Sequence, residues 1–181
     1  QDYRSSKKIF RFKKMINYIF NVTGYDNWLQ VAKKLKNNDI AKPILLFGND
    51  KRSNEIVNEF GEIHFNFDFH NYFPYKSKKT QYNSYKYDYF ESTNYLKAKD
   101  RCIKMMDRID FFGQFSRIDR EVYFHQLVLK YLTHLNNLFK NPDTIPHVYL
   151  SVENPHSHSQ YLLFNICDYL GIPCYKFTNW N

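Results

Sequence analysis

Residues 16–48 read INYIFNVTGYDNWLQVAKKLKNNDIAKPILLFG, and this stretch decides the fold. An apolar run at 16–22 is rich in residues that favour strands, and the turn residues at 23–25 break it. Over 26–36 apolar residues recur at three- and four-residue steps and lysines fill the other side, which predicts an amphipathic helix. A second apolar run follows at 44–47. Strand, helix and strand in about 32 residues have the size of a βαβ unit.

The same alternation continues along the chain and predicts an α/β fold. Further strands are expected at 63–69, 148–152 and 172–177, and further helices at 53–60, 95–112, 119–140 and 162–170. Strands that alternate with helices favour a parallel sheet covered on both faces. We therefore expect a Rossmann-like three-layer sandwich with a mostly parallel sheet of about five strands.

The length of 181 residues suits one domain, and we place it at 15–181 behind a basic tail at 1–14. Residues 71–92, NYFPYKSKKTQYNSYKYDYFES, lack a helical period and are expected to form a long insertion. Three cysteines at scattered positions argue against a disulfide framework and favour a reducing compartment. No apolar run approaches the roughly 20 residues of a membrane-spanning helix.

The formal net charge of +8 suits nucleic acid, an anionic membrane surface or phosphorylated small molecules as partners. Residues 1–14 carry six cations and one anion, a net charge of +5. This tail either lies on an anionic membrane or carries its charge into solvent. No secretory signal is visible, so we expect a cytoplasmic location, at the inner face of the membrane if the tail binds lipid.

The insertion at 71–92 interleaves tyrosines with lysines. Aromatic rings beside cations grip single-stranded nucleic acid, and they also stack on sugar rings. A composition rich in Tyr, Lys and Asn also arises from AT-rich coding alone. These three interpretations remain open at this point.

Ligands of open α/β sheets bind beyond the carboxyl ends of the strands. The expected substrate-binding residues at these ends are Gly24, Tyr25, Asp26, Asn49, Asp68, His70, Asn154 and His158. Thr23-Gly24 before a helix either presents backbone N–H groups to a phosphate or only turns the chain. Asp26 is also a candidate N-cap.

The segment SVENPHSHS at 151–159 is the most specific feature of the sequence. His156 or Glu153 suits the role of a general base, because both side-chain types can be tuned toward neutral pH. Alternatively, Ser157 or Ser159 caps the next helix and the imidazoles face water. The His-x-His spacing offers no third ligand, so we expect no metal site. Dinucleotide, P-loop and hydrolase-elbow motifs are absent.

Two segments carry a resemblance to a known family. They are IFNVTGYDNWLQVAKKLKNNDIAKPILLFG, and the expected helix at 119–140 followed by PHVYLSVENPHSHSQYLLFNICDYLGIPCYKF. This pattern resembles bacterial surface-polysaccharide (capsule) biosynthesis proteins of the glycosyltransferase type, and the first segment is similar to the N-terminal lobe of two-lobed (GT-B) enzymes.

The resemblance implies a lobe that binds a glycan acceptor, with no cofactor of its own. It also implies a nucleotide-sugar donor held mainly by a second lobe, which this sequence does not contain. Its catalytic base would sit on a loop after a strand, where His156, Glu153, His70 and Asp26 fit. The alternative is a non-enzymatic basic α/β module that binds nucleic acid or a nucleotide.

Overall fold

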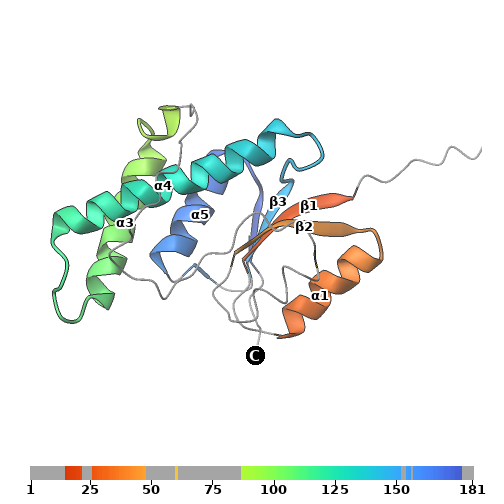
Figure 1. Cartoon of the computed structure of the whole chain (residues 1–181), viewed down its shortest axis with the longest axis horizontal. Helices are drawn as coiled ribbons and strands as arrows, with labels where there is room; N and C mark the ends of the chain where they lie inside the picture. Colours follow the sequence, from red (N-terminus) through yellow and green to blue (C-terminus); the bar gives the residue numbers. More distant parts are fainter. Residues whose placement is uncertain are drawn as a thin grey trace, which may run out of the picture.

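The computed structural model describes residues 15–21, 26–47, 60, 87–151, 154–155 and 157–176. Its elements in chain order are β1 (Ile16–Asn21), α1 (Asp26–Asn37), β2 (Ala41–Phe47), the 3₁₀ turn η1 (Tyr87–Tyr89), α3 (Thr93–Ile109), α4 (Arg117–Lys140), β3 (Val148–Ser151), α5 (His158–Tyr169) and β4 (Cys174–Lys176). Figure 1 shows α1 on one side of the sheet and α3, α4 and α5 on the other. The predicted α/β sandwich is therefore confirmed.

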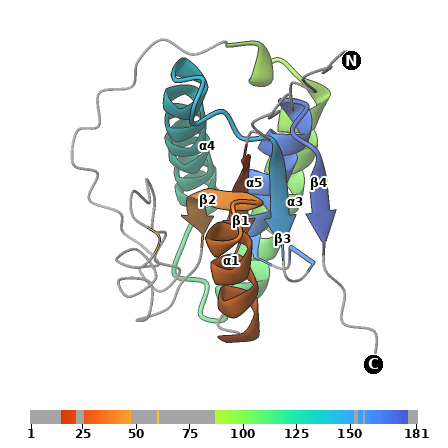
Figure 2. The same ribbon diagram turned by 90° about the vertical axis from the view of Figure 1, so that its right-hand side faces the viewer.

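The four described strands form one parallel sheet in the order β2-β1-β3-β4. The chain passes from β1 outward to β2 through α1, and from β3 outward to β4 through α5. Strand order therefore reverses between β1 and β3, which are neighbours in the sheet (Figure 2). The sequence predicted five strands, and the expected strand at 63–69 lies outside the described residues.

β1 is buried on both faces because it lies inside the sheet. Tyr18 and Phe20 pack against Ala32 of α1 in the smaller core cluster. Ile19 points to the opposite face and joins Tyr149 in the larger cluster with α3, α4 and α5. A strand covered on both faces reads as a largely apolar run, and in β1 only Asn17 and Asn21 interrupt it.

β2 begins at Ala41, earlier than the sequence predicted, and includes Pro43. β2 ends the described sheet order, and strands at a sheet edge tolerate a proline without a backbone N–H. The register with β1 shifts at this point, since Tyr18 pairs with Pro43 and Ile19 pairs with Leu45. The missing donor and the extra residue therefore coincide in one bulge.

Both long helices begin at serine caps that the sequence pattern did not identify. Ser92 accepts a hydrogen bond from the backbone N–H of Tyr95 (3.1 Å) and starts α3. Ser116 caps α4, and the Asp119 carboxylate accepts from the Ser116 backbone N–H (2.8 Å). Asp119 was predicted to open this helix, and it instead completes a capping box from the third helical position.

The buried face of α3 agrees only in part with the apolar pattern of its sequence. The buried residues of this helix are Tyr95, Ala98, Cys102 and Met106. The apolar residues whose spacing suggests this helix include Met106, which is buried, but also Leu96 and Ile109, which are 62% and 43% exposed. The face is selected by packing on α5, where the Cys102 Sγ donates to the backbone carbonyl of His158 (3.3 Å).

α4 carries the longest buried stripe. Its buried residues are Phe124, Leu127, Val128, Tyr131, Leu132, Leu135 and Leu138. Val122 and Phe139 belong to the same apolar pattern in the sequence of α4, but they are 51% and 37% exposed. The buried stripe packs against α3 and α5. It is narrower than the arc that all the apolar residues of α4 occupy.

Candidate functional site at the carboxyl edge of the sheet

The carboxyl ends of the described strands lie at one edge of the sheet. Asn21, the last residue of β1, pairs with Phe47 of β2 and with Ser151 of β3. Ser151 pairs in turn with Lys176, the last residue of β4. The sequence predicted that five strands deliver polar residues to one edge, and the four described strands do end at a common edge.

Most of the predicted site residues follow these ends in parts of the chain that are not described. Gly24, Tyr25, Asn49, Asp68, His70, Glu153 and His156 lie outside the described residues. The backbone of Asp26 is described and forms the first residue of α1, inside the helix rather than at the predicted N-cap. Asn154 is exposed three positions beyond the end of β3.

His158 occupies a different environment from the one expected. It is the first residue of α5, and it is only 2% exposed. Its ring packs edge-on against Tyr123, with the ring centroids 5.6 Å apart. Burial lowers the pKa of His158 to about 4, so the imidazole is neutral at pH 7. This corrects its assignment as a substrate-binding residue or a water-facing imidazole, because α3 and α4 cover it.

A capping box fixes the start of α5 beside this edge. The Ser157 Oγ accepts from the backbone N–H of Gln160 (3.3 Å), and the Gln160 Oε1 accepts from the Ser157 N–H (3.3 Å). Of the two serines considered from the sequence, Ser157 is thus the cap. The box satisfies two backbone N–H groups at the helix terminus, so fewer N–H groups remain to bind an anion.

Buried polar side chains underlie the same edge, and the sequence pattern did not identify them. Ser151 and Ser159 are fully buried, and Gln160 is 1% exposed. The Ser157 and Ser159 hydroxyl oxygens are 3.2 Å apart. A run of small polar residues between a buried strand and a helix is the signal that could have predicted this group. The contact between Ser157 and Ser159 gives the start of α5 a partly buried hydrogen-bonded base.

Asn17 fixes the opposite end of β1. Its side-chain amide donates to the backbone carbonyls of Asp143 (2.8 Å) and Ile145 (3.1 Å). Its backbone N–H donates to the Nδ1 of His147 (3.0 Å). These bonds hold the connection between α4 and β3 against β1, and they help set the register that aligns Asn21 with Ser151.

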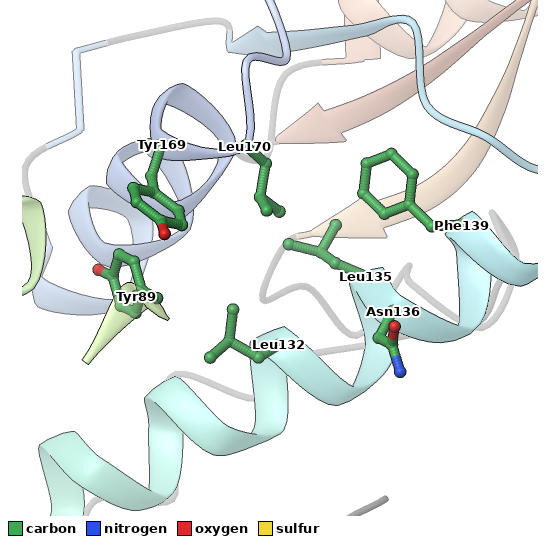
Figure 3. A pocket seen from close by; sticks show the side chains of 7 residues that line it. All are labelled: Tyr89, Leu132, Leu135, Asn136, Phe139, Tyr169 and Leu170. Carbon is green, nitrogen blue, oxygen red and sulfur yellow. The ribbon is translucent and has the colours of Figure 1, made fainter. Parts of the chain in front are cut away.

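A cavity of about 340 Å³ lies between η1, the C-terminal half of α4 and the end of α5 (Figure 3). Its lining residues are Tyr89, Leu132, Leu135, Asn136, Phe139, Tyr169 and Leu170. Figure 3 shows Leu132 and Leu135 rising from α4 toward Tyr169 and Leu170 at the end of α5. Among the residues that the structure describes, no imidazole, carboxylate or ammonium group lines it, so this cavity suits an apolar group rather than proton transfer.

The expectation of a long insertion at 71–92 needs correction at its C-terminal end, where Tyr89 lies. This residue is fully buried, and its hydroxyl donates to the Oδ1 of Asn165 (2.8 Å). A ring held in the core is not available to stack on a base or a sugar. Residues 71–86 of the expected insertion lie outside the described residues.

A comparison of the chain with protein-family models, curated proteins and solved structures found no match. Across the described ranges, no helix is both long and apolar enough to cross a bilayer. In this same part of the chain, no three His, Cys, Asp or Glu side chains gather as a metal site would require. The arrangement of the strand ends therefore carries the functional argument.

Proposed function

We propose that the chain is the acceptor-side lobe of a glycosyltransferase and binds a glycan acceptor at the carboxyl edge between β1 and β3. One observation carries this proposal: Asn21 pairs with Ser151 where the strand order reverses. In an open parallel sheet the connections diverge at such a point and leave a crevice for ligands. From these two adjacent strand ends the chain continues into residues 22–25 and 152–156.

The residue types that follow these ends suit sugar transfer. In this reaction an acceptor hydroxyl oxygen forms a bond to the anomeric carbon of the donor, and the bond to the nucleoside diphosphate breaks. A base takes the proton of the hydroxyl group. His156 or Glu153 would act as this base, and Asn154 would hydrogen-bond the acceptor. The nucleotide-sugar donor would be held mainly by a second lobe.

The rigid start of α5 supports this role. Catalytic groups need a backbone that is fixed to within a fraction of an ångström. The Ser157–Gln160 capping box and the buried ring of His158 anchor the chain directly after the proposed base. His158 is therefore a positioning residue in this proposal, not a group that touches substrate.

The test measures transfer of labelled sugar from a panel of uridine- and guanosine-diphosphate sugars by the full natural protein. We expect His156→Ala or Glu153→Ala to lower the rate by about 100-fold, the scale of a general base. His134→Ala on α4 and Glu91→Ala beside η1 are matched controls away from the carboxyl edge, and they should leave the rate unchanged. Unchanged transfer in both edge variants would refute the proposed base.

The alternative of a nucleic-acid module predicts a different response to salt. Binding of single-stranded nucleic acid through lysines releases counterions from the phosphate backbone. Added salt opposes this release, so binding weakens steeply as salt rises. Binding of a neutral glycan changes little under the same titration. A steep salt dependence of nucleic-acid binding, without detectable glycan transfer, would favour the alternative.

A further inference from the structure

The turn between α3 and α4 presents two aromatic rings to solvent. Phe111 is 86% exposed and Phe112 is 87% exposed, the highest values among the large apolar side chains described. Ile118 in the first turn of α4 is 74% exposed, and Ile109 at the end of α3 is 43% exposed. Single exposed apolar residues are ordinary, but four that surround one turn form a patch that needs a partner.

The turn that carries these rings is held by defined hydrogen bonds. The Asp110 carboxylate accepts from the backbone N–H groups of Gln114 (2.9 Å) and Phe115 (3.1 Å). The same carboxylate accepts from the Nη2 of Arg120 (2.7 Å). Gly113 adopts φ +59°, a conformation that a side chain at this position would strain. The rings are thus presented on a fixed backbone, which reduces the entropy lost when they bind.

The turn projects on the same side of the molecule as the candidate site. Cys102 of α3 contacts the carbonyl of His158 at the start of α5. α3 continues past this contact to Ile109, beyond the first turn of α5. In Figures 1 and 2 the connection from α3 to α4 lies toward the end of the molecule to which the strands point.

The size of the patch favours a lipid partner over a protein. A stable protein–protein interface buries about 800 Å² on each partner. Two phenylalanine rings bury about 400 Å² together, and charged side chains follow on both helices. A bilayer needs no matching surface, because its apolar phase accepts single rings that project from a rigid tip.

The charge around the patch is compatible with an anionic bilayer. Residues 93–121 carry seven Lys or Arg and five Asp or Glu. Arg120 pairs with Asp107 (3.1 Å) and with Asp110 (2.7 Å), so one positive charge is shared by two carboxylates close to the tip. The net charge of the whole chain is +8. An anionic surface therefore attracts the protein, and insertion of the rings supplies the local contact.

We propose that Phe111 and Phe112 insert into the interfacial layer of an anionic bilayer and hold the carboxyl edge of the sheet near the membrane surface. This inference goes beyond the proposed sugar transfer and does not depend on it. It also differs from binding through the basic tail at 1–14, because ring insertion is weakly sensitive to salt whereas attraction of the tail is screened.

The test is co-sedimentation of the full chain with vesicles of phosphatidylcholine and phosphatidylglycerol in equal amounts. We expect Phe111→Ser/Phe112→Ser to lower the partition coefficient by about tenfold or more, from the lost burial of two rings. Leu96→Ser is the matched control, because Leu96 is 62% exposed at the other end of α3. It should leave the partition coefficient unchanged. All three substituted positions are exposed, and thermal unfolding should confirm intact folds.

A second readout places the rings directly. Phe111→Trp should show a blue-shifted emission on addition of the vesicles at both low and high salt, and Leu96→Trp should show none. Equal vesicle binding by the wild type and the double serine variant would overturn the inference, as would no binding by the wild type. A wild-type dimer that dissociates in the double serine variant would also overturn it, because the rings would then contact a second copy of the chain.

Discussion

Burial changes the chemistry of His158 at the scale of a single residue. Its ring is 2% exposed and its pKa is lowered to about 4 by desolvation. The unfolded chain takes up this proton near pH 6.5, whereas the folded chain resists it. With respect to this group, the free energy of unfolding therefore has its full value above pH 6.5, and it falls as the pH drops from 6.5 toward 4. The loss from this group should reach about 3 kcal/mol, measured by urea unfolding across this range.

His158→Leu should remove most of this pH dependence. His125 is the comparison, because its pKa is also lowered, by burial and by the nearby Lys99, but its ring is only half-buried and bonds to the Tyr95 hydroxyl. His125→Leu should therefore flatten the profile less. A profile between pH 6.5 and 4 that is the same in His158→Leu and the wild type would contradict the assignment.

The sequence could not predict this burial. Spacing placed His158 correctly after the β3 strand and near a serine cap, because caps and strand ends have local signals. Whether its ring reaches solvent depends on α4, whose Tyr123 packs edge-on against it from an earlier part of the chain. Local periodicity carries no information about that contact, so the interpretation of a surface imidazole was wrong for a physical reason.

At the scale of an element, α4 shows that a helical pattern predicts the existence of a helix but not the face that packs. The existence of the helix followed from its period, but its apolar arc is broader than the face that packs. Val122 and Val128 both belong to the predicted stripe, and they are 51% and 0% exposed. The width of an apolar arc does not specify which neighbours cover it.

These two valines allow the same substitution to be compared on one helix. Val128→Ala should lower the free energy of unfolding by about 2–3 kcal/mol, because two buried methyl groups are lost and a cavity remains. Val122→Ala should change it by less than about 0.5 kcal/mol, since the site is exposed. Urea denaturation at pH 7 measures both values. Equal effects of the two substitutions would mean that the packed face of α4 is not the one described.

At the scale of the whole molecule, the sequence predicted the class of fold and the common edge, but not the strand order. Each βα unit has its own local pattern, whereas the pairing of β1 with β3 joins Tyr18 to Val148 across most of the chain. That pairing depends on long-range packing and on the Asn17 bonds to the α4–β3 connection. The position of the strand reversal, and with it the proposed binding edge, therefore required the structure.

The two faces of the sheet should differ in local stability. The larger core cluster joins α3, α4 and α5 to β1 and β3, whereas the smaller cluster carries α1 and the start of β2. Opening α1 exposes less buried apolar surface than global unfolding does. In native-state hydrogen exchange, we expect the amides of α1 to exchange through a local opening, and those of β1 and α5 to exchange only through global unfolding.

Ala32→Gly tests this difference, because Ala32 is 1% exposed in the middle of α1. The substitution should destabilise the helix by about 1 kcal/mol. Exchange of the α1 amides should then accelerate by about fivefold, while α5 amides change only as far as global stability does. Equal acceleration in α1 and α5 would mean that both faces of the sheet unfold as one unit. In that case the smaller cluster would support the carboxyl edge as firmly as the larger one.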